Sequence, residues 1–316
     1  METKQLKIGS LCTGYGGLDM AIEALTGGVT TWSSEIDKAS IKLINERFKV
    51  PQIGNLTKLD WSKIEPIDIL TAGYPCQPFS HAGSRKGTND PRHIWPSIKE
   101  AIRILRPKGV FMENVTGHLN LGFSNVLGDL AEIGFNAQWI CLRASDVGAP
   151  HRRERLFIFA YPNDEFAKRQ LLSELGYEQS SSRFNLFMQS KQGQVTTYSH
   201  PRTYSQVRRG YRELRAESNR LRAGQDEGQA GQVARGSTAY DLAIEHWEGL
   251  TRKAPDSLTE GLVDTRFIEW LMGLPEGWVT GMGFTRIQES KLLGNGVVPA
   301  QAYAAYSLIL DNLCKS

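Results

Sequence analysis

Short apolar runs alternate with longer amphipathic stretches through the first half of the chain. An apolar run bounded by glycine, proline or polar residues predicts a buried strand, and apolar positions recurring every three to four residues predict a helix. Strands are predicted at Lys7–Leu11, from Ile67 onward, and at Gly109–Val115, Asn136–Leu142 and Leu156–Ala160. Helices are predicted between them at Leu18–Leu25 and Ile94–Leu105. This alternation is typical of an α/β fold with a mixed, mostly parallel sheet.

The pattern changes after about residue 164. Residues 165–260 lose the alternation and are rich in Gln, Ser, Gly and Arg, which makes a poor core. Between Pro201 and Arg235 there are eight arginines, no lysine and four acids, a local net charge of 8 − 4 = +4. This segment is interpreted either as a surface for a polyanion or, over 223–236 in particular, as a flexible solvated insertion.

Ordered patterns return towards the carboxyl terminus. They comprise 240–247, 267–278, a glycine-flanked asparagine turn at Leu292–Pro299, and a helix at Ala300–Leu313. The chain end is expected to pack back on the first domain. The predicted division is therefore one domain of residues 1–164 with 286–316, and a smaller domain of residues 165–285.

Composition narrows the class of protein. The chain has 316 residues, 22% of them charged, and a net charge of only +3, so any basic surface must be local. Its four cysteines (Cys12, Cys76, Cys141 and Cys314) have no close pair, which argues against a zinc site and a disulfide framework and fits a reducing compartment. No apolar run of about 18 residues and no signal segment occurs, so the expectation is a soluble, cytoplasmic protein.

Candidate chemistry begins at the first strand. The turn Thr13–Gly17 follows that strand and precedes a helix, the opening of a nucleotide-binding α/β unit. A glycine turn alone is weak evidence for a nucleotide site, because many such turns only connect a strand to a helix. Glu35 strengthens it, since it lies 19 residues after Gly16, near the ~20-residue spacing at which an acid grips ribose hydroxyls. Asn55 could read an adenine amino group; for Glu35, the alternative is a solvated surface acid.

A second cluster of candidates lies at the ends of later strands. Cys76 follows the strand that starts at Ile67, at the sheet edge where ligands collect; a lone cysteine is more often a small buried hydrophobe. Glu113 ends the next strand, where a buried unpaired carboxylate would be costly. Arg153 and Arg155 share one face of an extended segment, as an anion clamp or a salt-bridged strand end. The polar loop 81–92 is a candidate lid.

The order of these motifs resembles the DNA (cytosine-5)-methyltransferases of restriction–modification systems and phages. The matching blocks are SLCTGYGGLDMAIEAL, SSEID, GYPCQPFSHAG, MENV, RASDVGAPHRRERLFIFA, FIEWLMGLPEGW and LLGNGVVP. They cover nearly the whole chain except the polar stretch, which corresponds to the target-recognition region of that family. The resemblance implies a Rossmann-like methyltransferase domain that uses S-adenosylmethionine, with a smaller DNA-binding domain.

The resemblance also implies roles for residues. Cys76 would add to carbon 6 of cytosine, which makes carbon 5 nucleophilic; a thiolate suits this because it is strongly nucleophilic. Glu113, with a raised pKa, would protonate or hydrogen-bond ring nitrogen 3. Arg155 would orient the cytosine carbonyl with support from Arg153. The cytosine would be flipped out of double-stranded DNA, and the loop after Cys76 would close over it.

The same match supplies the binding residues. The cofactor would contact residues of the glycine turn, the two following segments and the carboxyl-terminal turn, namely Leu11, Cys12, Gly14, Tyr15, Gly16, Gly17, Glu35, Ile36, Asn55, Leu56, Pro75, Asn295, Gly296 and Val297. DNA would be contacted by Gln77, Ser80, Arg85, Lys86, Arg92, Arg208, Arg209 and Arg212. No metal is expected, the enzyme is expected to act as a monomer, and a cognate restriction endonuclease could accompany it.

Four positions depart from the family pattern. Cys12 stands where phenylalanine is frequent, Asn55 where aspartate is usual, His151 where glutamine is usual, and Trp270 where a second arginine is common. The first two bear on cofactor affinity, and none replaces Cys76.

Other functions stay open. An RNA cytosine-5 methyltransferase on the same scaffold would carry the same core motifs. A catalytically inactive DNA-binding relative would not need Cys76, Glu113 and Arg155 together. A dehydrogenase is disfavoured, because a nicotinamide enzyme has no use for the Pro-Cys-Gln loop.

Overall fold

The structure, a computed structural model, describes residues 5–75, 94–175, 239–259 and 262–315. Several residues predicted from the sequence lie outside these ranges: the proposed nucleophile Cys76, the loop 81–92, the arginine-bearing segment 201–235, and all the predicted DNA contacts (Gln77, Ser80, Arg85, Lys86, Arg92, Arg208, Arg209 and Arg212). Their roles remain predictions from the sequence.

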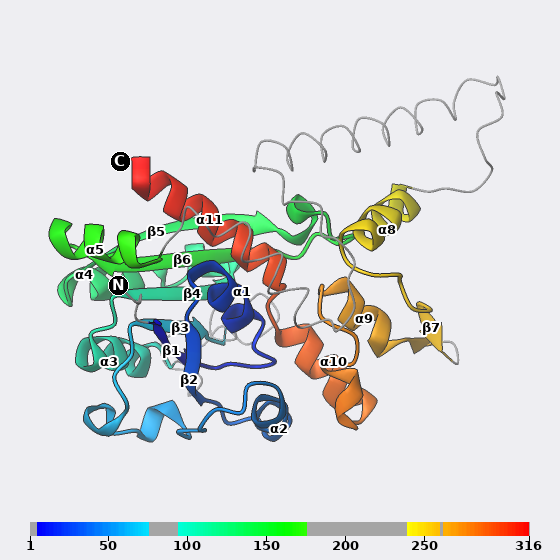
Figure 1. Ribbon diagram of the computed structural model, residues 1–316, viewed down its shortest axis with the longest axis horizontal. Helices are drawn as coiled ribbons and strands as arrows, with labels where there is room; N and C mark the ends of the chain where they lie inside the picture. Colours follow the sequence, from blue (N-terminus) through cyan, green and yellow to red (C-terminus); the bar gives the residue numbers. More distant parts are fainter. Residues whose placement is uncertain (1–4, 76–93, 176–238, 260–261, 316) are drawn as a thin grey trace.

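A six-stranded sheet with the order β2-β1-β3-β4-β6-β5 forms the centre of the molecule (Figure 1). Its strands are β1 (Lys7–Leu11), β2 (Val29–Ser34), β3 (Ile69–Gly73), β4 (Gly109–Val115), β5 (Phe135–Arg143) and β6 (Glu154–Pro162). The pairs β1–β2, β1–β3 and β3–β4 are parallel, whereas β6 runs antiparallel to both β4 and β5. The predicted α/β fold with a mixed, mostly parallel sheet is confirmed, and β4 has the predicted bounds.

Helices flank the sheet and extend beyond it. They are α1 (Gly17–Thr26), α2 (Lys38–Arg47), α3 (Trp95–Leu105), α4 (Phe123–Glu132), α5 (Glu165–Leu175), α8 (Ala239–Leu250), α9 (Thr265–Leu271), α10 (Arg286–Asn295) and α11 (Pro299–Lys315). A short hairpin of β7 (Leu258–Thr259) and β8 (Leu262–Val263) precedes α9.

Local sequence explains where several helices start and stop. Asp37 caps α2 by accepting a hydrogen bond from the Ser40 backbone N–H, and Gly27 ends α1 in the left-handed conformation. Thr285 and Gln288 form a reciprocal capping box that starts α10. The predicted turn at Leu292–Pro299 was therefore partly wrong. Helix α10 continues through Asn295, and the turn before α11 comprises only residues 296–298.

Alternate side chains of the sheet enter two different cores, because successive strand residues point to opposite faces. On one face Ile69, Phe111 and Phe159 pack with α1, α5 and α11; on the other Leu70 and Met112 pack with α3 and α4. Glu113 follows Met112 in β4 and therefore points to the same face as Phe111. This alternation brings Glu113 under the helices α1 and α11.

A third core joins the later helices to the glycine turn. Trp247 of α8, Phe267 and Trp270 of α9, and Trp278 pack together with Tyr15 from the segment before α1. Helix α5, by contrast, packs Leu171 and Leu175 against the sheet. The proposed division at residues 165 and 285 stays a prediction.

In the part of the chain that the structure describes, no helix is both long and apolar enough to cross a lipid bilayer. Within the same ranges, no group of three or more His, Cys, Asp and Glu side chains is arranged to hold a metal ion.

Candidate active site

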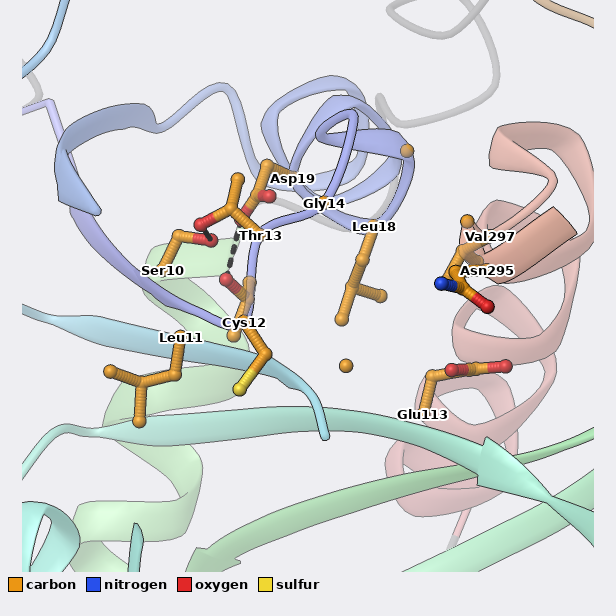
Figure 2. A pocket seen from close by; sticks show the side chains of 14 residues that line it. Ser10, Leu11, Cys12, Thr13, Gly14, Leu18, Asp19, Glu113, Asn295 and Val297 are labelled. Carbon is orange, nitrogen blue, oxygen red and sulfur yellow. Dashed lines mark hydrogen bonds between the residues drawn. The ribbon is translucent and has the colours of Figure 1, made fainter. Parts of the chain in front are cut away.

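A pocket of about 330 Å³, counted out to its open mouth, lies where β1, β3 and β4 end (Figure 2). One wall is the loop after β1 and the start of α1, from Ser10 to Asp19, and the opposite wall is the turn Asn295–Val297. Thr71, Gly73 and Glu113 of β3 and β4 complete the described lining. The pocket therefore sits at the carboxyl edge of the parallel strands, where ligands bind in open α/β sheets.

Backbone geometry shapes the glycine turn. Gly14 and Gly16 have φ angles of 59° and 82°, in the left-handed region that glycine adopts without strain. No neighbouring atom would lie within 4 Å of a side chain added at Gly14, so this part of the turn is open to a ligand. Glu35 braces the turn, because its Oε2 accepts a hydrogen bond from the Gly14 N–H at 3.0 Å.

Tyr15 ties the turn to the carboxyl-terminal segment. Its side chain is fully buried, and its hydroxyl donates a hydrogen bond to the Val297 carbonyl oxygen at 2.7 Å. A Cβ placed on Gly296 would lie 1.7 Å from the Tyr15 ring, so only glycine fits beneath the ring. The two walls of the pocket, which are 282 residues apart in sequence, are thus held in register by one side chain.

A loop from the third core supports Tyr15 from behind. Trp278 donates its indole N–H to the Tyr15 carbonyl oxygen at 3.0 Å. That loop is anchored by Glu269, which is fully buried and accepts hydrogen bonds from the backbone N–H groups of Gly277, Val279 and Thr280 at 2.6–3.0 Å. The Thr280 hydroxyl donates a fourth, at 3.0 Å. A buried carboxylate thus organises the support of the glycine turn.

Glu113 carries the charge chemistry of the pocket. It is 7% exposed, and its Oε1 lies 3.0 Å from Nε of Arg155, which projects from the adjacent strand β6. Burial raises the pKa of Glu113, while the charges of Arg155 and Arg153 act in the opposite direction. Arg153 itself donates to the carbonyl oxygens of Gly294 and Gly296 at 2.9 and 2.6 Å. The predicted rise in the pKa of Glu113 is confirmed, and both arginines lie close enough to influence it.

A buried histidine fixes the strand end that leads to Cys76. His118 is fully buried; its Nδ1 lies 2.9 Å from the Leu121 carbonyl oxygen, and its Nε2 lies 2.9 Å from the Tyr74 hydroxyl. A carbonyl oxygen only accepts, so Nδ1 carries a proton and donates to Leu121, while Nε2 forms the second hydrogen bond, with the Tyr74 hydroxyl. Tyr74 immediately precedes Pro75 and Cys76 in the sequence.

Comparison with known proteins assigns the chain to a family. The model of the C-5 cytosine-specific DNA methylase family matches residues 6–310. The chain belongs to this family. The type II methyltransferase M.MspI of Moraxella sp. is 33% identical over 183 residues, which are 54% of this chain and 43% of that protein. M.HhaI of Haemophilus parahaemolyticus is 33% identical over 164 residues, half of each chain. The chain spans about half the length of the curated relatives it matches.

Solved structures agree on the fold. The Dnmt2 methyltransferase of S. pombe matches with a TM-score of 0.58 at 17% identity, covering 98% of this chain and 99% of that one. The Entamoeba histolytica methyltransferase EhMeth matches with a TM-score of 0.59 at 18% identity over the same shares. Both likenesses show a common fold.

Within this C-5 cytosine-specific methylase fold, the predicted cofactor residues fall into two groups. The first group lines the pocket and comprises Leu11, Cys12, Gly14, Gly17, Asn295, Gly296 and Val297. The second lies outside the lining and comprises Tyr15, Gly16, Glu35, Ile36, Asn55, Leu56 and Pro75. Ile36 is 70% exposed, and the side-chain oxygen Oδ1 of Asn55 accepts hydrogen bonds from the backbone N–H and the hydroxyl of Thr57. The structure adds Asp19 to the lining, which the sequence reasoning did not single out.

The departures from the family pattern have local explanations. Cys12 lines the pocket in the left-handed conformation, and burial raises the pKa of its thiol, which keeps it neutral. His151 donates Nε2–H to the Leu271 carbonyl oxygen at 2.9 Å, and burial lowers its pKa. Trp270 is fully buried in the third core and donates its indole N–H to the Arg252 carbonyl oxygen. The ring N–H groups of His151 and Trp270 are thus satisfied by backbone carbonyl oxygens of the protein itself.

Proposed function

We propose that the protein is a DNA (cytosine-5)-methyltransferase that transfers the methyl group of S-adenosylmethionine to carbon 5 of a cytosine flipped out of duplex DNA. Family membership supports the reaction class. The single observation that carries the proposal is the buried Glu113–Arg155 pair in a pocket bordered by the end of β3, because the sequence places Cys76 three residues beyond that strand.

The pocket fits the cofactor. Left-handed glycines leave room for a ligand against the turn, and Gly14 has open space where a side chain would stand. The amide of Asn295 lines the opposite wall. We infer that the turn 11–17 and Asn295–Val297 hold S-adenosylmethionine, with Glu35, Ile36, Asn55, Leu56 and Pro75 at its ribose and adenine end. When bound, the cofactor supplies an electrophilic methyl group on a sulfonium sulfur.

The protein's own residues prepare the base. The Cys76 thiolate forms a bond from sulfur to cytosine carbon 6, and the addition converts the ring into an enamine in which carbon 5 is nucleophilic. Glu113 in its protonated form donates to ring nitrogen 3, which burial favours by raising its pKa. Arg155 binds the carbonyl at carbon 2. After carbon 5 has been methylated, its proton leaves to a base and the sulfur–carbon 6 bond breaks, which restores Cys76.

The substrate and the partners are also proposals. The substrate would be double-stranded DNA, read by residues of the region 165–285 and by the loop after Cys76. The names of the relatives, type II methyltransferases, support a role in restriction–modification, alongside a cognate endonuclease and in the cytoplasm of a prokaryotic or phage-infected cell. An RNA substrate is the alternative that the same pocket chemistry would allow.

The test is covalent trapping. Purified protein is incubated with S-adenosylmethionine and duplex DNA that contains 5-fluorocytosine in many sequence contexts, because fluorine at carbon 5 prevents the final elimination. We expect an adduct with the wild type and none with Cys76→Ser, while Glu113→Gln forms it at least about 100-fold more slowly. Sequencing the trapped DNA would give the target site. An adduct on RNA but not on DNA would move the protein to the alternative, and an adduct in Cys76→Ser would overturn the mechanism.

A further inference from the structure

Asp19 is a buried carboxylate in the wall of the pocket, and no basic residue in the described part of the chain neutralises it. It lies in the first turn of α1, is 1% exposed, and accepts a hydrogen bond from the Thr71 hydroxyl at 2.5 Å. The Ser10 hydroxyl also hydrogen-bonds to it. Across the described ranges, Asp19 forms no ion pair with any lysine, arginine or histidine. Its hydrogen-bond partners among the described residues are therefore neutral: two hydroxyl groups and its own backbone N–H.

The helix that contains Asp19 is buried along nearly its whole length. Nine of the ten residues of α1 are buried, all except Glu23. Figure 2 shows Asp19 behind Thr13, on the same wall of the pocket as Cys12. A carboxylate buried without a countercharge is unfavourable, although a position in the first turn is partly offset by the positive end of the helix. The burial of Asp19 needs a further reason.

The other titratable groups that line the pocket do not supply that countercharge. Glu113 is paired with Arg155, and the Cys12 thiol is held neutral by burial. The charged group that bears most on Asp19 is Glu23 of the same helix, which is also acidic. The pKa of Asp19 is raised by burial to about 6, so at neutral pH the carboxyl is mostly ionised. Among the described residues, the pocket thus presents one negative charge that has no countercharge.

We propose that Asp19 supplies the negative charge that binds the cationic part of the cofactor and makes the pocket prefer a positively charged adenosyl ligand to a neutral one. This inference rests on the proposed function, and it adds a specificity-determining residue to it. Two cationic groups could be the partner, the sulfonium and the α-ammonium of S-adenosylmethionine. Both would be attracted to the same carboxylate, and ligands that lack one or both distinguish them.

The experiment is a comparison of binding affinities by isothermal titration calorimetry on the full chain without DNA. The ligands are S-adenosylmethionine, with both cations; S-adenosylhomocysteine, with the ammonium only; and 5′-methylthioadenosine, with neither. The variants are Asp19→Asn and, as a control, Asp68→Asn, a buried aspartate at the start of β3 that does not line the pocket. We expect Asp19→Asn to weaken S-adenosylmethionine about tenfold or more and 5′-methylthioadenosine less than about twofold.

Binding of S-adenosylhomocysteine shows which cationic group of the cofactor is the partner of Asp19. If the sulfonium is the partner, S-adenosylhomocysteine will behave like 5′-methylthioadenosine; if the ammonium is, it will weaken like S-adenosylmethionine. Equal weakening of all three ligands in Asp19→Asn would overturn the proposal, because it would indicate a merely structural role. If the wild type binds none of the three ligands, both the proposed cofactor and this inference are overturned. That outcome differs from equal weakening in Asp19→Asn, which would overturn this inference alone.

The wild type alone provides a second test should the variant not fold. Protonation of Asp19 removes its charge, so the ratio of affinities for S-adenosylmethionine and 5′-methylthioadenosine should fall about tenfold between about pH 7.5 and about pH 5. The sulfonium keeps its charge throughout this range, and the α-ammonium only becomes more fully protonated at the lower pH, so titration of the ligand cannot produce the expected fall. Dividing by the affinity of the neutral ligand cancels effects of Glu23, Glu35 and Glu113 that act on both ligands. A ratio that stays constant would overturn the proposal.

Discussion

The substitution Glu269→Gln tests whether the Glu269 carboxylate stabilises the loop 277–280 through its hydrogen bonds. The carboxylate accepts four hydrogen bonds, from three backbone N–H groups and the Thr280 hydroxyl. Glutamine has nearly the same shape, but only one of its two terminal atoms accepts. Its oxygen can keep the contacts with Val279 and Thr280, whereas its NH₂ group would then face the N–H of Gly277.

The expected loss follows from this geometry. One buried backbone N–H loses its acceptor and faces another donor, which costs about 1–3 kcal/mol. The two remaining backbone hydrogen bonds change from charged to neutral acceptors, at about 0.5–1 kcal/mol each. Relief from burying a charge offsets part of this sum. The free energy of unfolding should therefore fall by about 2–4 kcal/mol.

Urea denaturation followed by tryptophan fluorescence measures the change, since Trp247, Trp270 and Trp278 lie in the core that the loop closes. Glu289→Gln is the matched control, because Glu289 is also buried but its recorded partner among the described residues is a single hydroxyl, that of Thr265. We expect the control to change stability by less than about 1 kcal/mol. Equal effects of the two substitutions would refute the role assigned to the four hydrogen bonds.

Two further predictions concern the wall of the pocket. Tyr15→Phe removes the hydroxyl that donates to Val297, and should lower the free energy of unfolding by about 1–3 kcal/mol while leaving the ring in place; urea denaturation checks this, and an unchanged midpoint would contradict it. For Asp19, burial raises the pKa from 3.8 to about 6, so between these values the folded protein binds more protons than the unfolded chain. Stability should therefore fall as pH rises through this window, by about 3 kcal/mol for a difference of 6 − 3.8 = 2.2 pH units. Unfolding measured across this window should show a flatter pH dependence in Asp19→Asn than in the wild type, and identical slopes would rule the assignment out.

Local pattern accounts for most of the scaffold. Apolar runs located the strands, because each strand in the middle of a doubly covered sheet must be apolar on both faces. The sequence also placed Glu113 correctly at the pocket, because polar residues first appear at the carboxyl end of a buried strand. The predicted turn around Asn295 was partly wrong because the capping box at Thr285 starts a helix that runs through it.

The long-range contacts that hold the pocket together could not be predicted from local sequence patterns. Tyr15 and Val297 meet across 282 positions, and no period along the sequence records such a contact. Tyr15 was predicted from its motif as a cofactor residue, whereas its side chain faces the protein. Asp19 did leave a signal, an acid between Leu18 and Met20 directly after the glycine turn. The sequence GLDMAIEAL contains this acid and Glu23, but only packing reveals that the helix buries Asp19 and leaves Glu23 less buried.

The bond between Tyr15 and Val297 also sets an order of events during synthesis. The glycine turn is synthesised well before the wall that it needs, because Val297 lies 282 residues after Tyr15, next to α11, which packs against α1. Contacts of such long sequence separation form late in folding, because the intervening chain must first be closed into a loop. A nascent chain thus holds only one wall of the pocket until α10 and the turn before α11 have been synthesised. A ligand that needs both walls is expected to bind only after that point.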